Sequence, residues 1–190
     1  MNRRDALSRV ALILGGTIIG AEAFLSGCKN PTTSTASGTF TPDTVALLDE
    51  VGETILPATA GSPGAKEAKI GAFMQTIVTD CYDEKDQKTF ADGIAKLGDA
   101  SQKKFSKDFM SLSAQEKHDL LVDLDKEAKD YNKTRKEGDP NHYFSMIKQL
   151  TIWGYFTSEP GATKALRYVA VPGRYDGCIP YKKGDKAWAT

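Results

Sequence analysis

The residue types most able to do chemistry in this sequence are two histidines, three cysteines and scattered serines and carboxylates. His118 lies within the charged run QEKHD, and His142 follows Pro140-Asn141 at an expected helix start, so both are interpreted as ordinary helix residues. Ser158 lacks the GxSxG turn of a serine hydrolase and is interpreted as a helix cap. The histidines and cysteines do not have the close spacing of a zinc site. The sequence therefore predicts neither a catalytic residue nor a metal site.

One cysteine does stand in a recognisable motif. Cys28 ends the tetrapeptide LSGC, which matches the lipobox, where a cysteine is acylated and becomes the new N-terminus of a bacterial lipoprotein. The segment before it begins with Arg3 and Arg4 and continues into an uncharged run, residues 10–21, which is too short for a membrane span of about 20 apolar residues. We expect residues 1–27 to be a signal peptide and Cys28 to anchor the chain to the periplasmic side of a bacterial membrane.

The arginine pair also bears on the route of export. Arg3-Arg4 ahead of a weakly hydrophobic, glycine-containing segment is typical of twin-arginine signals, which carry proteins that have already folded. The stretch NRRDALS lacks the aromatic residue that commonly follows such a pair. Twin-arginine export is therefore the favoured interpretation, and general secretory export remains the alternative.

The other two cysteines are Cys81 and Cys178. In an oxidising compartment an even number of remaining cysteines indicates a disulfide. Such a bond would close a long loop and would contribute about 4–5 kcal/mol in the chain-entropy model. The alternative is two unpaired thiols, with Cys81 buried, because it continues an apolar stripe that includes Ile70 and Ile77. Both interpretations stay open at this point.

The charge balance excludes one large class of partners. The chain has 25 basic and 25 acidic residues, whereas a nucleic-acid-binding domain needs a basic face to neutralise phosphates. A hydrophobic content of 40% in 190 residues is typical of one globular domain. Residues 28–40, rich in Ser, Thr and Gly, are expected to form a flexible tether, and residues 41–190 the domain.

The spacing of apolar residues predicts helices throughout this domain. Thr41 and Pro42 form a typical helix start, and Ser113 with Glu116 forms a capping box. No alternating strand pattern occurs, so the fold is expected to be all-α, with about six helices and an irregular C-terminal tail. The expected helices are residues 42–56, 70–81, 86–97, 114–131, 143–156 and 159–169.

The sequence also predicts how far one of these helices and the C-terminal tail are buried. Residues 143–156 are apolar on nearly all sides, which indicates a central buried helix and favours internal packing for Trp153 and Phe156. The tail beyond residue 170 is rich in Gly and Pro but is expected to be packed, because it contains several large apolar side chains. These are Tyr175, Ile179, Tyr181 and Trp188.

Three motifs give the domain a resemblance to a known family. They are ETILPATAGSPGAKEAKIGAFM at residues 53–74, GYFTSEPG at residues 154–161 and PGRYDGCIP at residues 172–180. In this order and spacing they resemble the small subunit of bacterial gluconate 2-dehydrogenase, called subunit 3 or the gamma subunit. The sequence departs from the family's usual pattern at its start, where LSGC is added and the aromatic residue of the export signal is missing.

The resemblance implies a non-catalytic subunit. In that family the small subunit accompanies a large FAD-containing flavoprotein of the glucose-methanol-choline type, usually together with a cytochrome c that carries haem. The flavoprotein oxidises a sugar or sugar acid and folds around FAD before export, so a small subunit with a twin-arginine signal would carry it across the membrane. No cofactor is expected in this chain itself.

A partner surface is expected where the apolar helix ends and the chain turns. Tyr155, Glu159, Arg174 and Tyr175 are the predicted contact residues, because aromatic and arginine side chains at rigid turns often dominate interfaces. Two alternatives remain. The chain could be a free-standing periplasmic lipoprotein that binds a ligand or a cell-envelope partner. It could also be an enzyme that uses Ser158 or a carboxylate, which the lack of a nearby base argues against.

Overall fold

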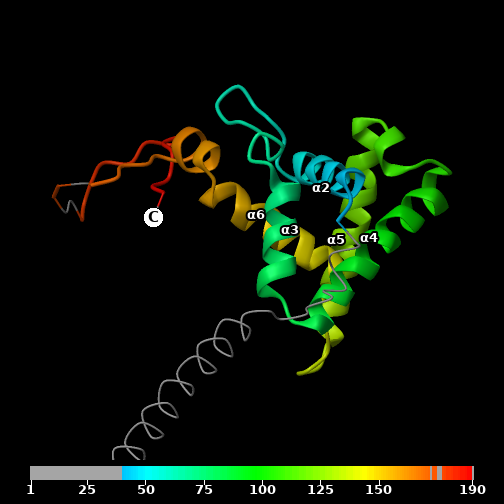
Figure 1. Ribbon diagram of the computed structural model, residues 1–190. Coiled ribbons are helices and arrows are strands. Elements are labelled where there is room, and N and C mark those ends of the chain that lie inside the picture. Colours follow the sequence, from blue (N-terminus) through cyan, green and yellow to red (C-terminus); the bar gives the residue numbers. More distant parts are fainter. Residues whose placement is uncertain (1–39, 172, 175–176, 190) are drawn as a thin grey trace, which may run out of the picture. The chain divides into compact units, whose positions relative to one another are not determined.

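The computed structural model describes residues 40–171, 173–174 and 177–189, and in these residues it is helical with no β-strand (Figure 1). The predicted all-α fold is confirmed. The predicted signal peptide and most of the predicted tether, including Arg3, Arg4 and Cys28, lie outside the described residues. The elements are α2 (Pro42–Ile55), α3 (Ile70–Cys81), α4 (Glu84–Phe105), the 3₁₀ turn η1 (Phe109–Ser111), α5 (Ala114–Thr134), α6 (Tyr143–Thr157) and the π-helical turn η2 (Gly161–Ala165).

Side-chain caps set the starts of the helices. Thr41 Oγ1 accepts the Thr44 N–H at 3.2 Å, with Pro42 in the first turn of α2, as the sequence predicts. The Asp83 carboxylate caps α4, which therefore begins before the predicted residue 86. The same helix also runs eight residues beyond the predicted end at Leu97, to Phe105. It continues because Ser101 is buried one turn after Leu97 and extends the inward face, until Ser106 adopts a left-handed conformation with φ 52°.

The predicted capping box of α5 is present and gives the fold an acid-sensitive contact. Glu116 Oε2 accepts the Ser113 N–H at 2.8 Å, and Ser113 Oγ accepts the Glu116 N–H at 3.3 Å. Lys107 lies 3.1 Å from the same carboxylate. The pKa of Glu116 is lowered from 4.5 to about 2, first by the Ser113 N–H, then by the Ser113 hydroxyl and Lys107.

Glu116→Gln is therefore expected to reduce the pH dependence of stability in acid. Because the folded pKa lies below the unfolded value, the contribution of Glu116 is present above pH 4.5 and is lost as the pH falls towards 2. Urea midpoints measured across this range should fall less steeply for Glu116→Gln than for the unmodified chain. Glu137→Gln, at an exposed loop position, is the control, and an equal flattening in that variant would contradict the assignment.

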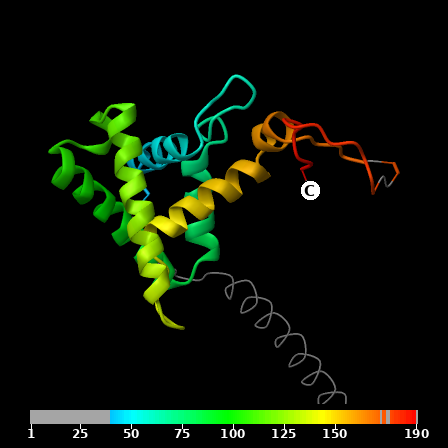
Figure 2. The same ribbon diagram turned by 180° about the vertical axis from the view of Figure 1, so that it is seen from behind.

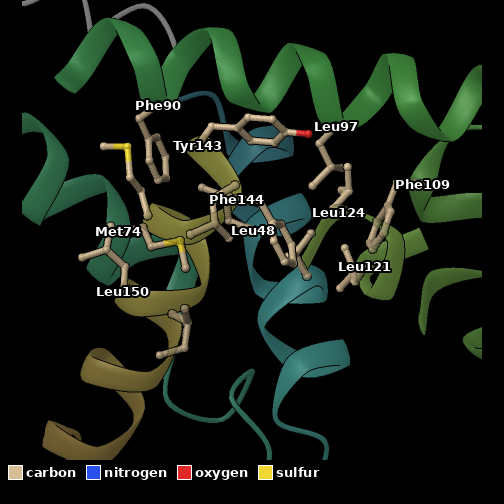
Figure 3. Packing of buried hydrophobic residues seen from close by; sticks show 14 of the residues in the cluster. Leu48, Met74, Phe90, Leu97, Phe109, Leu121, Leu124, Tyr143, Phe144 and Leu150 are labelled. Atoms are coloured by element: carbon tan, nitrogen blue, oxygen red, sulfur yellow. The ribbon is translucent and has the colours of Figure 1, made fainter. Parts of the chain in front are cut away.

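Helix α6 is the central element of the described domain, as predicted from its apolar sequence. It contacts each of α2, α3, α4 and α5, and Figures 1 and 2 show it running between them. Its first half is buried on most sides; in Figure 3, Phe144 lies at the middle of the core beside Leu48 of α2, with Phe90 of α4 near Met74 of α3. The core therefore fixes the position of α6 from its N-terminal end.

The start of α6 is pressed against α4. Gly93 leaves no room for a side chain, because a Cβ there would overlap Tyr143. Tyr143 is buried at this contact, and burial raises its pKa to about 12. His142 precedes it as the N-cap, with Nδ1 accepting the Phe144 N–H at 3.3 Å. The helix-start interpretation of His142 is confirmed.

The C-terminal tail is packed less than the sequence predicts. Tyr181, Ile179 and Trp188 are exposed, and Tyr175 lies outside the described residues. The tail instead closes on itself, since Arg167 forms an isolated parallel bridge with Trp188. Apolar residues separated by Gly, Pro and Lys form no continuous face, so they cannot pack onto the helices as a stripe does.

Candidate interaction surface

Two carboxylates of α2 hold the loop between α2 and α3, residues 57–69: Glu50, whose Oε2 lies 2.8 Å from Lys66 Nζ, and Glu53. Glu53 Oε1 accepts the Ala58 N–H at 3.0 Å, and Glu53 Oε2 accepts the Lys66 N–H at 2.9 Å. Hydrogen bonds to an ionised acceptor are stronger than neutral ones. Gly64 lies so close to this carboxylate that a Cβ at the position would overlap it. The first sequence motif is thus a loop of defined shape that is closed around Glu53.

Tyr155 ties this loop to the end of α6. Its hydroxyl donates to the Pro63 carbonyl at 2.5 Å and lies 2.7 Å from Ser62 Oγ. Ser62 and Pro63 are more than ninety positions away from Tyr155 in sequence. These hydrogen bonds therefore join the motif at residues 53–74 to the motif at residues 154–161. Tyr155 is only 3% exposed. The prediction that it contacts a partner is therefore wrong; its role is internal.

Three apolar side chains near Tyr155 on the same helix are exposed, in contrast to Tyr155 itself. Ile152, Trp153 and Phe156 are 40%, 50% and 39% exposed, and we call these three residues the α6 aromatic face. The expected internal packing of Trp153 and Phe156 is thus wrong as well. Residues 152 and 156 are one turn apart, whereas Tyr155 lies one turn after buried Thr151, so the helix separates the two sets onto different sides.

Ring contacts with the partly buried Phe73 and the buried Tyr155 hold the two aromatic side chains of this face in place. The Trp153 ring meets the Phe73 ring of α3 edge-on, with centroids 5.4 Å apart. The Phe156 ring meets the Tyr155 ring in the same manner at 5.1 Å. Gly154 allows α6 to approach α3 closely, since a Cβ at this position would lie only 2.5 Å from Cδ1 of the Phe73 ring. The exposed rings of Trp153 and Phe156 are therefore each packed on one side against another ring, which restricts their orientation.

A groove of about 400 Å³ adjoins this face between α5 and α6. Ile152, Trp153 and Ala128 are apolar residues of its lining, and the charged residues Lys129 and Lys148 line it as well. Both lysines bind the Asp125 carboxylate, at 2.7 and 2.6 Å, and these hydrogen bonds lower the pKa of Asp125 below its usual value. Protein–protein interfaces in general combine apolar with polar and charged residues, as the lining of this groove does.

The turn after α6 is built by Ser158. Its hydroxyl donates to the Tyr155 carbonyl at 2.6 Å and accepts the Gly161 N–H at 3.1 Å, so the predicted cap is confirmed. Glu159 is exposed at this turn, and its predicted partner contact stays a prediction. The helix expected at residues 159–169 is wrong beyond η2, because Arg167 leaves helical geometry to pair with the tail.

The remaining predicted site residues do not gather at this surface. His118 is exposed on α5, as expected, and Arg174 is exposed in the tail, where its predicted contact stays untested. Tyr175 lies outside the described residues. Within the described ranges, no group of His, Cys, Asp and Glu could hold a metal ion, and no helix there is long and apolar enough to cross a membrane.

The two cysteines of the described domain are both free thiols and both exposed. The expected burial of Cys81 is wrong: the residue ends α3, and the buried part of that helix stops at Val78. Cys178 lies in the tail. A disulfide between Cys81 and Cys178 stays a prediction for the oxidised protein.

The signal that could have revealed the α6 aromatic face was present in the sequence. Positions 152, 153 and 156 share one side of a helix, and Gly154 marks the side where another helix approaches. The surrounding residues are also apolar, however, so the pattern alone does not say which side lies against the core.

Comparison with known proteins gives one match. The model of the family described as "Gluconate 2-dehydrogenase subunit 3" matches residues 42–173, which is more than half of the chain. The matched range contains the loop closed by Glu53 and the whole of α6. No curated protein and no solved structure matches the chain.

Proposed function

Because the chain belongs to the gluconate 2-dehydrogenase subunit 3 family, we propose that it is the non-catalytic small subunit of a membrane-associated, FAD-dependent dehydrogenase of the gluconate type. It binds the flavoprotein subunit, of the glucose-methanol-choline type, through the α6 aromatic face. The FAD resides in that partner, and a third, cytochrome c subunit with haem accepts the electrons. The substrate of the complex is a sugar or a sugar acid.

The observation that carries this proposal is the joining of two motifs by Tyr155. Its hydrogen bond to Pro63 fixes the loop at residues 57–69 against the end of α6, beside exposed Trp153 and Phe156. Rigid aromatic residues next to a groove are typical binding anchors, since their immobilisation costs little conformational entropy. The matched family is named for a subunit, which agrees with a surface built for contact.

The roles of the most reactive side chains support an accessory function. Ser158 Oγ is engaged by two backbone groups of its own turn, and His142 Nδ1 caps α6. His118 projects from an exposed position on α5. Each of these residues therefore has a structural or a solvent-exposed position. Each histidine also lies 3.5 Å from a carboxylate, His118 beside Asp119 and His142 beside Glu127, whereas Ser158 bonds to backbone groups of its own turn and not to a histidine.

The proposed location is the periplasmic side of a bacterial membrane. Cys28 carries the lipid anchor, and the arginine pair Arg3-Arg4 directs twin-arginine export, so that the small subunit carries the folded flavoprotein with it. Residues 28–40 then tether the domain near the bilayer.

A gentle affinity purification of the tagged protein from native membranes tests the proposal. A large co-purifying chain with the absorbance spectrum of an oxidised flavin is the expected result, and haem bands would add the cytochrome. Dithionite should bleach the flavin bands. A colourless protein that purifies alone would contradict the subunit role and would favour the free-standing lipoprotein, with the groove beside Trp153 as its ligand site.

A further inference from the structure

The C-terminal tail is a closed loop with its own clasp. The Arg167 N–H donates to the Ala187 carbonyl at 2.8 Å, and the Ala189 N–H donates to the Arg167 carbonyl at 3.0 Å. The Arg167 guanidinium lies 4.0 Å from the centroid of the Trp188 ring, a cation–π contact. The chain thus leaves the domain after η2 and returns to the same place, as Figures 1 and 2 show.

The loop exposes large apolar side chains to an unusual degree. Val171 is 81% and Tyr181 is 76% exposed, and several others are exposed to about half. The further exposed side chains are Tyr168, Val169, Ile179 and Trp188. Single exposed apolar residues are common on proteins, but a cluster confined to one clasped segment indicates a surface that something covers.

The end of the loop is also basic. Residues 181–189 contain three lysines and one aspartate, in a chain whose formal net charge is zero. A tight turn arranges them: the Asp185 N–H donates to the Lys182 carbonyl at 3.0 Å, and the Asp185 carboxylate accepts the Lys182 N–H at 2.9 Å. Gly184, with φ +99°, allows this turn. The aspartate is thereby turned towards its own backbone, while Lys182 and Lys183 are exposed beside Tyr181.

We propose that this tail binds the surface of an anionic lipid bilayer, with Tyr181 and Trp188 at the headgroup level and Lys182 and Lys183 against lipid phosphates. Tyr and Trp are the residues that favour the membrane–water interface, and nearby lysines are attracted to anionic lipids. An irregular segment can bind there because its backbone stays hydrated, whereas it could not enter the hydrocarbon core. The tail adds a second contact to the lipid anchor and orients the domain.

The predicted tether would make this second contact reachable. Residues 28–40 would span about 20 Å on average as a random coil, which keeps the domain close to the bilayer to which Cys28 is attached. The inference rests on the proposed membrane location. Its test uses neither the lipid anchor nor the flavoprotein, so it can fail while co-purification succeeds, and the reverse.

The test is vesicle binding by the mature chain from residue 28 with Cys28→Ser, which retains all described helices. Sedimentation with vesicles of phosphatidylethanolamine and about one third phosphatidylglycerol should show salt-sensitive binding that pure phosphatidylcholine vesicles do not support. In a Trp153→Phe background Trp188 is the single tryptophan, and its emission should shift to shorter wavelength on binding. Lys182→Glu with Lys183→Glu should weaken binding about tenfold or more.

The matched control reverses two exposed lysines on the helices, Lys88→Glu with Lys126→Glu, and should leave vesicle binding nearly unchanged. An equal loss in this control would assign the effect to net charge and overturn the proposal. Absence of vesicle binding by the Cys28→Ser chain would overturn it too. So would a Lys182→Glu, Lys183→Glu variant that binds vesicles as tightly as the unmodified tail does.

Discussion

Tyr155→Ala is expected to lower the free energy of unfolding by about 3–5 kcal/mol, the range for deleting a buried aromatic ring. The side chain is 3% exposed, and its hydroxyl is the only described hydrogen-bond donor to reach the Pro63 carbonyl from α6. Removing it leaves a cavity at the end of α6 and frees the loop at residues 57–69. Urea or thermal unfolding of the purified domain measures the loss, and amide exchange in the loop should accelerate.

The conservative variant separates the ring from its hydroxyl. Tyr155→Phe keeps the packing and removes the hydrogen bond to Pro63, so we expect a loss of about 1–2 kcal/mol. Weak partner binding by Tyr155→Ala would follow from the loosened loop and not from a lost contact. If Tyr155→Ala unfolded at the same urea concentration as the unmodified chain, the internal role of Tyr155 would be refuted.

Trp153→Ala with Phe156→Ala is expected to have the opposite profile. Trp153 and Phe156 are 50% and 39% exposed, against 3% for Tyr155, so the fold should lose less stability than it does with Tyr155→Ala. If they are the anchors of the flavoprotein contact, each truncation costs about 2 kcal/mol or more in binding, and the pair lowers affinity by roughly 10³-fold or more. Co-purification with the flavoprotein, followed by a titration of the two purified subunits, measures this effect.

The control for this pair uses apolar residues of similar exposure elsewhere. Met110 and Val122 are 49% and 51% exposed on η1 and α5, and neither lines the groove beside Trp153. Met110→Ala with Val122→Ala should leave flavoprotein binding unchanged. Equal binding by the Trp153→Ala, Phe156→Ala protein would remove the α6 aromatic face as the docking surface and move attention to the loop at residues 57–69.

The different positions of Tyr155 and Trp153 could not be predicted from the sequence pattern of α6. Residues 143–156 are apolar on nearly every side, so helical periodicity predicts the helix and its central place but not the direction each ring faces. The structure buries Tyr155 through a hydrogen bond to Pro63, a residue with no local relation to it in sequence. It leaves Trp153 half exposed, with its ring in edge-on contact with the Phe73 ring of α3.

Local signals in the sequence were sufficient for several features of the fold. Thr41 and Ser113 were predicted as caps because capping needs only a side chain and a backbone N–H within one turn, and both are confirmed. Ser158 is confirmed for the same reason. The all-α class follows from periodicity alone, and the three motifs predicted the family that the comparison then matched.

The sequence by itself thus determined the all-α class, the caps at Thr41, Ser113 and Ser158 and the family, which depend on helical periodicity, on neighbours within a turn or on short motifs. Only the tertiary structure decided which side of α6 faces outward, that Cys81 is exposed at the end of α3, and that the tail closes on Arg167. These features depend on where distant segments stop and what they cover. Burial is a property of the packed whole, and the spacing of residues along one helix does not contain it.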